Sequence, residues 1–429
     1  MKLNYRSLTI IIISALISNQ PLQAQHSGKH RANASLNIYT HTNDSVKQSA
    51  FNVGFFTNIE QLKGVGINAI SSVVKKNAYG VQLSGLANMN GNNMAGFQLG
   101  GITNINGNSA LGMLASGLVN LTGHHANGVS LSGGINIAGQ AINGFGFAGL
   151  MNVCGGDNKG VMASGLANIS ANNAKGVTLS GLMNVSAKDL EGVQIASLLN
   201  ITGDKAKGTQ ISAFGNVSVD MNGLQMAGVG NICAQNMKGV QIGLANYAKE
   251  MKGTQLGLLN LCVGEVKGVQ IGLVNHSKDT TTVKIGLVNV SPKTRIQLLA
   301  YGGNNAKFNL AVRFKNRMTY TMLGVGAPYL KLNDKFSGAL FYRAGLYWTL
   351  LKQLEISGDV GYYHIENFDN ESDNIPARMY SLQARINLEY HPIKKFGIFA
   401  SGGYGVTRYY SQDKTFENKP IIEFGIVLF

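Results

Sequence analysis

Charged residues are scarce in this chain: Asp, Glu, Lys and Arg make up 13% of its 429 residues, and there are only 6 prolines and 3 cysteines. Low charge combined with 55 glycines argues against a charged disordered tail and against an ordinary enzyme. The glycines do not recur at every third position, which excludes collagen. No stretch contains about 18 or more uninterrupted apolar residues, so any insertion into a membrane would use strands.

The basic residues outnumber the acidic ones and give a formal net charge of +15. They are scattered, without a run of about five or more, so nucleic acid is not an expected partner. An anionic membrane or a polysaccharide surface fits this charge better.

The N-terminus is typical of a secretory signal peptide. Lys2 and Arg6 precede a short apolar core from Leu8 to Ile17, and Ala24 is a small residue at a suitable cleavage position. No cysteine follows directly, so a lipoprotein anchor is not expected. The sequence therefore predicts export.

A repeated phrase that ends in asparagine dominates the middle of the chain. The asparagines lie sixteen residues apart up to Asn216 and then fourteen or fifteen apart. A glycine opens each phrase, as Gly160 and Gly176 do. The complete asparagine column is Asn88, Asn104, Asn120, Asn136, Asn152, Asn168, Asn184, Asn200, Asn216, Asn231, Asn246, Asn260, Asn275 and Asn289. Repetition of this kind indicates units that stack on one another.

Alternation within a unit is typical of a strand. In "GVQIGLVN", which ends at Asn275, it predicts that Ile271 and Leu273 share a face with the asparagine and that Gln270 lies on the other face. The longer units carry one extra small residue, which we interpret as a bulge or corner.

Two architectures fit the repeat. In a β-solenoid one unit is one coil, and the asparagines form a structural ladder whose amides satisfy backbone groups. In one large β-barrel each unit is an antiparallel strand with its turn, of about 9–11 residues for a membrane strand. Antiparallel strands would place successive asparagines at opposite rims and favour a doubled period. The single period therefore favours the solenoid, with the large barrel as the alternative.

Side chains that often form chemical sites have no matching partners here. Cys154, Cys233 and Cys262 each follow a repeat asparagine by two places, in a column of small residues, and the last two would be roughly 9–10 Å apart in a stack, too far for a disulfide. His124 and His125 fall in a repeat turn, and Gly155-Gly156-Asp157 matches a calcium repeat only once. The acidic stretch at 366–374 is expected to be a solvated loop. We expect no catalytic residue, metal site or cofactor.

The composition changes near Pro292, and aromatic residues concentrate after it. About eight strands can be marked from Ile296 onward. The clearest, "YSLQARINLEYH" from Tyr380 to His391, alternates apolar and polar residues, with Arg385 and Glu389 on the polar face. This pattern suits a strand with lipid on one side and a polar barrel interior on the other.

The signal sequence, the alternating aromatic strands and the terminal "EFGIVLF" together resemble bacterial outer-membrane β-barrel proteins. The resemblance implies that Phe429 belongs to a barrel insertion signal, read by the insertion machinery. The "GVQIGLVN" units resemble those of bacterial surface-repeat proteins.

The sequence thus predicts an all-β, non-enzymatic protein of the cell outer membrane. Its expected parts are a signal peptide (1–24), an N-terminal linker (25–50), a β-repeat region (51–293) and a barrel (294–429). The expected role is a surface scaffold or adhesin in the envelope, and the expected partners are outer-membrane lipid, the insertion machinery and a surface polysaccharide or host-cell ligand. The alternative is a large pore or transporter in which the repeats are barrel strands.

Overall fold

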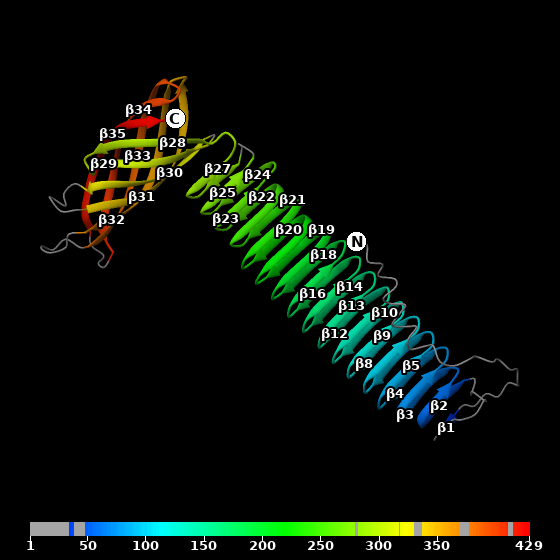
Figure 1. Ribbon diagram of the computed structural model, residues 1–429. Coiled ribbons are helices and arrows are strands. Elements are labelled where there is room, and N and C mark those ends of the chain that lie inside the picture. The colour runs from blue at the N-terminus through cyan, green and yellow to red at the C-terminus, as the bar shows by residue number, and fades with distance from the viewer. Residues whose placement is uncertain are drawn as a thin grey trace. The chain divides into compact units, whose positions relative to one another are not determined.

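The computed structural model describes residues 34–37, 48–278, 282–316, 318–329, 337–368, 377–410 and 415–429. The predicted signal peptide lies outside this range. No helix occurs among the described residues, which form a β-solenoid of about 15 turns and a closed eight-stranded antiparallel barrel (Figure 1). This architecture confirms the predicted solenoid and barrel, and it excludes the alternative of one large barrel that includes the repeats.

Each sixteen-residue coil up to Gly223 contributes a longer and a shorter strand to two parallel sheets. The longer strands are β4 Ala78–Ser84, β6 Met94–Gly100, β8 Ala110–Ser116, β10 His125–Ser132, β12 Ala141–Ala148, β14 Asn158–Ser164, β16 Ala174–Ser180 and β18 Leu190–Ala196. The shorter strands are β5 Ala87–Asn90, β7 Thr103–Asn106, β9 Val119–Thr122, β11 Ile135–Ala138, β13 Met151–Cys154, β15 Ala167–Ser170 and β17 Met183–Ser186. Repeat asparagines pair in register, as Asn168 does with Asn184, so translation along the stack explains the single period.

The remaining coils are formed by strands of other lengths. At the N-terminal end these are β1 Ala34–Asn37, β2 Ser49–Ile59 and β3 Leu62–Val74. Later in the chain they are β19 Leu199–Ser212, β20 Gly215–Ala227, β21 Gly230–Ile242, β22 Ala245–Leu256, β23 Leu259–Cys262, β24 Val266–Ile271, β25 Val274–Ser277, β26 Val283–Ile285 and β27 Val288–Val290.

Buried amides share the interior of the solenoid with apolar side chains such as Met162 and Leu190, and their position corrects the predicted faces of the repeat. Gln270 and Asn275 are both fully buried, whereas Ile271 and Leu273 are exposed. The reason is a corner at Gly272, where the chain passes from one sheet to the other and the strand alternation restarts. The extra small residue of the longer units lies at this corner, as predicted.

Exposed apolar side chains line the outside of these corners, and we call them the corner column. Its exposed members are Leu86, Ile102, Leu118, Leu150, Leu166, Leu182, Leu198, Phe214, Val229, Leu244, Leu258 and Leu273.

Charged residues of the solenoid lie in a separate segment, which we call the charged edge. It is the segment of each coil between the small-residue column and the next phrase-opening glycine. Every Asp, Glu and Lys from Gly64 to Lys278, a range that the structure describes throughout, lies in this edge.

The phrase-opening glycines kink the longer strands. Gly176 has a φ of +115°, and a Cβ built there would lie 2.1 Å from the carbonyl oxygen of Gly160 in the preceding coil. Only glycine tolerates both the dihedral angle and this close approach. The kink allows the buried residues on either side of it, Ala174 and Thr178, to point into the same interior.

The barrel closes in sequence order, and β28 pairs with both β29 and β35. Its strands are β28 Arg295–Gly303, β29 Ala306–Lys315, β30 Thr319–Tyr329, β31 Ser337–Leu351, β32 Leu354–Asn367, β33 Arg378–Ile393, β34 Phe396–Tyr409 and β35 Thr415–Leu428. The number of strands agrees with the prediction.

Candidate functional site

The asparagine column forms a continuous hydrogen-bonded ladder within each part of the solenoid. Asn168 accepts a bond from the Nδ2 of Asn152 at 2.8 Å and donates to the Oδ1 of Asn184 at 2.9 Å and to the carbonyl of Leu179 at 2.7 Å. The same pattern recurs from Asn88 to Asn216 and from Asn231 to Asn289. Each asparagine thus joins two coils and also holds the corner that follows.

A second ladder of glutamines runs beside the asparagines, and the sequence analysis missed it. Gln270 donates to Gln255 at 2.8 Å, and Gln255 donates to Gln241 at 2.8 Å. The sequence does contain a signal for this ladder, because a glutamine recurs two places after the phrase-opening glycine. Uninterrupted alternation predicts that Gln270 lies on the face opposite Asn275, whereas the corner between them turns both side chains inward.

The last asparagine of the ladder is capped by the barrel. Asn289 has no further coil to bond to, and its Nδ2 donates to the Oγ1 of Thr321 on β30 at 3.0 Å. Tyr342 on β31 donates its hydroxyl to the carbonyl of Gly286 at 3.0 Å. The final coil therefore lies against the outer wall of the barrel, a contact that no sequence pattern indicated.

The three cysteines are free and buried in the small-residue column. The Sγ of Cys154 donates to the carbonyl oxygens of Asp157 at 2.8 Å and Gln140 at 3.1 Å. Burial raises the pKa of this thiol above its ordinary value. A thiol held in its protonated form is a poor nucleophile and a poor metal ligand, so Cys154 is a packing residue.

The outward face of the barrel is apolar. On β33 the residues alternate as the sequence predicts: Leu382, Ile386 and Leu388 are exposed, while Arg385 and Glu389 are buried. Exposed apolar residues of the other strands are Leu298, Leu310, Val325, Leu340, Val360, Ile398, Tyr404, Ile422 and Phe424. On β33 the large apolar side chains thus face outward and the ionisable ones inward.

The inward face holds two groups of paired charges. In one, Arg343 donates to both carboxylate oxygens of Asp359 at 2.9 and 2.7 Å, and Arg385 lies 3.1 Å from Glu423. Asn387 also donates to Asp359, at 2.8 Å. Each enclosed carboxylate of this group faces a guanidinium, as buried charges require.

The second group lies at the end of the barrel where β29 finishes. Arg313 donates to both carboxylate oxygens of Glu389 at 2.8 Å, and Lys315 pairs with Glu355. Glu355, Glu389 and His391 bring their ligand atoms within 4.8 Å of one another, a spacing that suits a metal ion. The ammonium of Lys315 already supplies positive charge to both carboxylates, so the cluster is satisfied as an ion-pair network.

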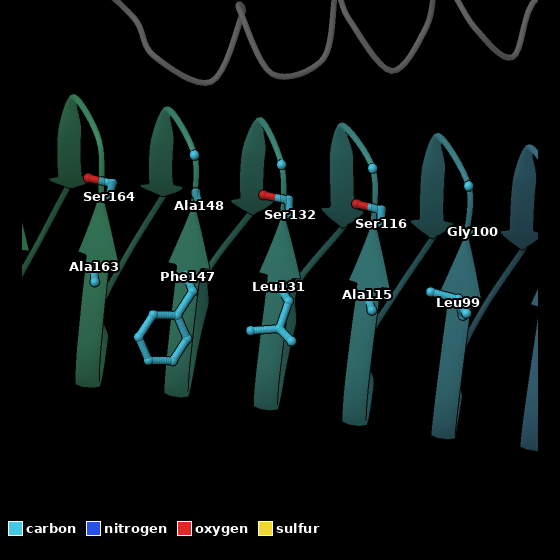
Figure 2. A pocket seen from close by; sticks show the side chains of 14 residues that line it. Leu99, Gly100, Ala115, Ser116, Leu131, Ser132, Phe147, Ala148, Ala163 and Ser164 are labelled. Atoms are coloured by element: carbon cyan, nitrogen blue, oxygen red, sulfur yellow. The ribbon is translucent and has the colours of Figure 1, made fainter.

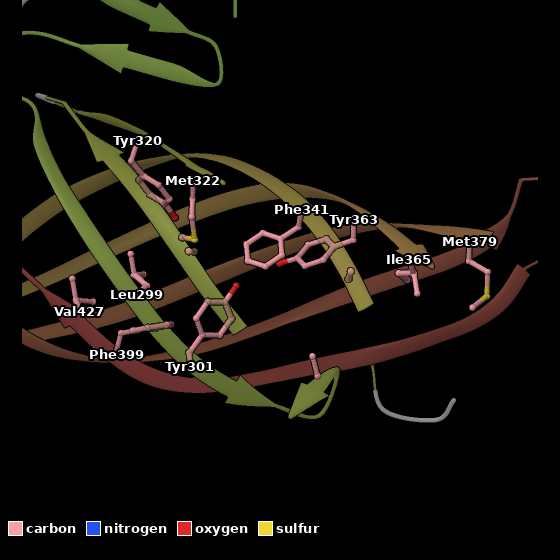
Figure 3. Close-up of a cluster of buried hydrophobic side chains, with 13 residues drawn as sticks. Leu299, Tyr301, Tyr320, Met322, Phe341, Tyr363, Ile365, Met379, Phe399 and Val427 are labelled. Carbon is pink, nitrogen blue, oxygen red and sulfur yellow. The ribbon is translucent and has the colours of Figure 1, made fainter. Parts of the chain in front are cut away.

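Aromatic side chains fill the space beside these charges (Figure 3). Tyr301, Phe341, Tyr363 and Phe399 are buried together, and the rings of Phe341 and Tyr363 stack with centroids 4.8 Å apart. Charges and rings together pack the interior of the barrel, as is usual for eight strands.

The remaining residues considered in the sequence do not form a common site. On the charged edge, His124 lies in a turn and His125 begins β10. Asp157 also lies on this edge, where it pairs with Lys159. Most of the acidic stretch at 366–374 lies outside the described residues. Phe429 is exposed at the end of the chain, beyond the last residue of β35.

Among the described residues, no helix is long and apolar enough to cross a bilayer. No protein-family model matches the chain, and no curated protein matches its sequence. A solved structure, the N-terminal β-barrel domain of Pseudomonas aeruginosa OprF, is similar with a TM-score of 0.22 and 14% identity. The match covers 31% of this chain and 93% of that one.

Proposed function

We propose that this chain is an exported, non-enzymatic outer-membrane protein in which β28–β35 anchor the solenoid. The observation that carries the proposal is the segregation of the barrel residues. A barrel surrounded by water would expose its charges, whereas here Arg343, Arg385 and their partners are enclosed and the outside is apolar. This distribution suits lipid outside and a polar interior. Because the interior is packed, the barrel anchors and does not conduct.

The connections between strands support a periplasmic position for the solenoid. Outer-membrane barrels have short periplasmic turns and longer extracellular loops. At the end where β28 begins, the turns are 316–318, 352–353 and 394–395. At the opposite end, the connections are 304–305, 330–336, 368–377 and 410–414. The solenoid enters, and the chain ends, at the short-turn end.

In this arrangement the repeats form a scaffold inside the envelope. The surface display expected from the sequence gives way to periplasmic attachment, and a surface polysaccharide or host ligand is not part of the proposal. The insertion machinery, which would read the terminal strand and Phe429, remains a proposed partner.

Cysteine labelling of whole cells tests both the anchor and its orientation. The three native cysteines are first replaced by serine, which other coils carry in the same column. Single cysteines are then placed at three positions. Arg378 lies at the long-loop end of the barrel, Lys394 lies at its short-turn end, and Lys175 lies on the charged edge of the solenoid. With a membrane-impermeant maleimide, Arg378→Cys should react in intact cells, whereas Lys394→Cys and Lys175→Cys should react only after the outer membrane is permeabilised.

The reverse pattern would support surface display. Recovery of the protein in the soluble periplasmic fraction would contradict the membrane anchor itself.

A further inference from the structure

Near the long-loop end of the barrel, the outward face changes from apolar to polar. The register of β32 and β33 places Glu366 beside Arg378 and His364 beside Tyr380. These positions alternate with buried ones, so their side chains point away from the barrel interior. We call this group the rim cluster, and its members on β32, on β33 and at the end of β34 are His364, Glu366, Arg378, Tyr380, Arg408 and Tyr410.

The rim cluster has more basic than acidic groups, since it contains two arginines and one glutamate. The Nε of Arg378 donates to Glu366 at 3.0 Å, and the side chain of Arg378 is 67% accessible, so the rest of its guanidinium can reach a ligand. The Nδ1 of His364 bonds with the hydroxyl of Tyr410 at 2.9 Å. Guanidinium groups match the geometry of phosphate oxygens, so the cluster suits a phosphate group.

A groove on the same outward face runs beside the rim cluster. It lies over β29 to β32 and has a volume of about 330 Å³. His364 and Glu366 line it on one side, whereas Gly338 adds no bulk to its floor and large apolar residues line the rest. A second hollow of about 500 Å³ continues the groove toward the short-turn end, and the two share the lining residues Leu310, Val325 and Leu340.

The hollow beside the corner column of the solenoid lacks this combination (Figure 2). It crosses strands β6 to β14 with a volume of about 730 Å³, and it is lined by Leu131 and Phe147 and by small residues such as Ser132. None of its lining residues is charged, so it cannot select a ligand by charge. The barrel groove differs because an apolar channel meets a basic cluster, which matches the two parts of a lipid.

We infer that the rim cluster and its groove bind a phosphorylated lipid of the leaflet at the long-loop end. The phosphate is held by Arg378 and Arg408, and an acyl chain occupies the groove. This inference rests on the proposed membrane anchor, which places lipid against this face. A lipid is favoured over a free phosphate because the groove beside the arginines is apolar. The change from Leu382 to Arg378 along β33 also marks the level at which headgroups would lie.

The test measures lipid binding to the full chain in a neutral detergent by native mass spectrometry. Phosphatidic acid is compared with diacylglycerol, which lacks only the phosphate, and with glycerol phosphate, which lacks the acyl chains. Arg378→Gln and Arg408→Gln remove the proposed phosphate contacts, and Gly338→Leu fills the groove. The matched controls are Lys394→Gln, at the short-turn end, and Gly402→Leu on β34, where a new Cβ would meet no atom within 4 Å. Heat resistance in SDS confirms that each variant is folded.

Phosphatidic acid should bind more tightly than diacylglycerol, and each arginine variant should weaken it about tenfold, the effect of one lost bond to a charged group. Gly338→Leu should weaken both lipids, and the two control variants should bind as the native chain does. Equal binding of the two lipids, or equal losses in the controls, would overturn the inference. Glycerol phosphate that competes as well as phosphatidic acid would also overturn it, because the groove would then contribute nothing.

The membrane anchor is tested separately, in vesicles whose lipids carry a spin label on the acyl chain. In the cysteine-free background, a fluorophore attached to Ile386→Cys on the plain barrel wall should be quenched by these lipids. Absence of quenching would refute the anchor. Quenching at Ile386 without a preference for phosphatidic acid would leave the anchor in place and refute only the lipid site.

Discussion

Replacing one asparagine in the middle of the ladder should lower the free energy of unfolding far more than replacing a partly buried asparagine outside the ladder. Asn168→Ala deletes three short hydrogen bonds, two that the side chain donates and one that it accepts, together with a long one to Met162. At a net value of about 1 kcal/mol for each bond, the free energy of unfolding should fall by about 3 kcal/mol. The loss of unfolding free energy should destabilise the whole stack, because in repeat proteins each unit is stabilised mainly by its neighbours.

The assay is denaturant unfolding of the full chain in detergent, followed by circular dichroism, with electrophoretic mobility in SDS as a separate report on the barrel. Asn172→Ala is the matched control, because Asn172 lies in the turn of the next coil and is only partly buried. It should change the unfolding free energy by about 0.5 kcal/mol or less. If the two variants unfold at the same denaturant concentration, the ladder does not hold the coils together.

The acidic replacement at the same position separates loss of donors from loss of packing. Asn168→Asp keeps the shape of the side chain, but a carboxylate cannot donate to Leu179 or Asn184, and burial of its charge is costly. Burial raises the pKa of such a carboxyl, so the protein should be least stable at neutral pH and recover as the pH falls and the group is protonated. A pH-independent defect would contradict this account.

Three further predictions concern the glycine kink, the buried thiol and the barrel interior. Gly176→Ala should lower the denaturation midpoint strongly, whereas Gly230→Ala, whose new Cβ would lie 3.4 Å from the carbonyl oxygen of Ala245, should leave it nearly unchanged; equal midpoints would refute the steric explanation. Since the pKa of Cys154 is raised from 9.0, the unfolded chain releases this proton first, and stability relative to Cys154→Ser should fall as the pH rises through 9.0; parallel pH profiles would contradict this. Asp359→Asn removes the carboxylate that accepts two bonds from the enclosed Arg343 and leaves it only Glu423, so a loss of about 3 kcal/mol should reduce the heat resistance of the barrel in SDS; an unchanged resistance would show that the pair is not needed.

The sequence predicts the parts of the fold that depend on local repetition. The spacing of Asn168, Asn184 and their equivalents favours a stacked solenoid, because one period fixes one translation, although it leaves one large barrel as the alternative. Alternation along β33 likewise places Arg385 and Glu389 inside the barrel, since successive residues of a strand point to opposite sides.

Contacts between distant strands could not be predicted in this way. Arg343 meets Asp359 and Glu423 only because eight strands close into a barrel, and closure brings β31 and β35 side chains to one interior. The cap between Asn289 and Thr321 has the same origin: it depends on where the final coil meets the barrel wall, which no period in the sequence specifies.

The wrong assignment of Ile271 and Leu273 to the face of Asn275 follows from a rule that holds for proteins in water, where apolar faces turn inward. The solenoid interior holds the amide ladders together with some apolar side chains such as Met162 and Leu190, whereas Ile271 and Leu273 remain outside. Backbone groups buried in the stack must still be paired within the protein. Parallel stacking pairs them along the coils, and Thr321 and Tyr342 bond to the final one. The barrel also separates its side chains by position in the strand, with Leu382 and Ile386 outside and Arg385 inside. In both parts the direction of a side chain therefore follows from the local backbone: the corner in a coil and the pleat in a barrel strand.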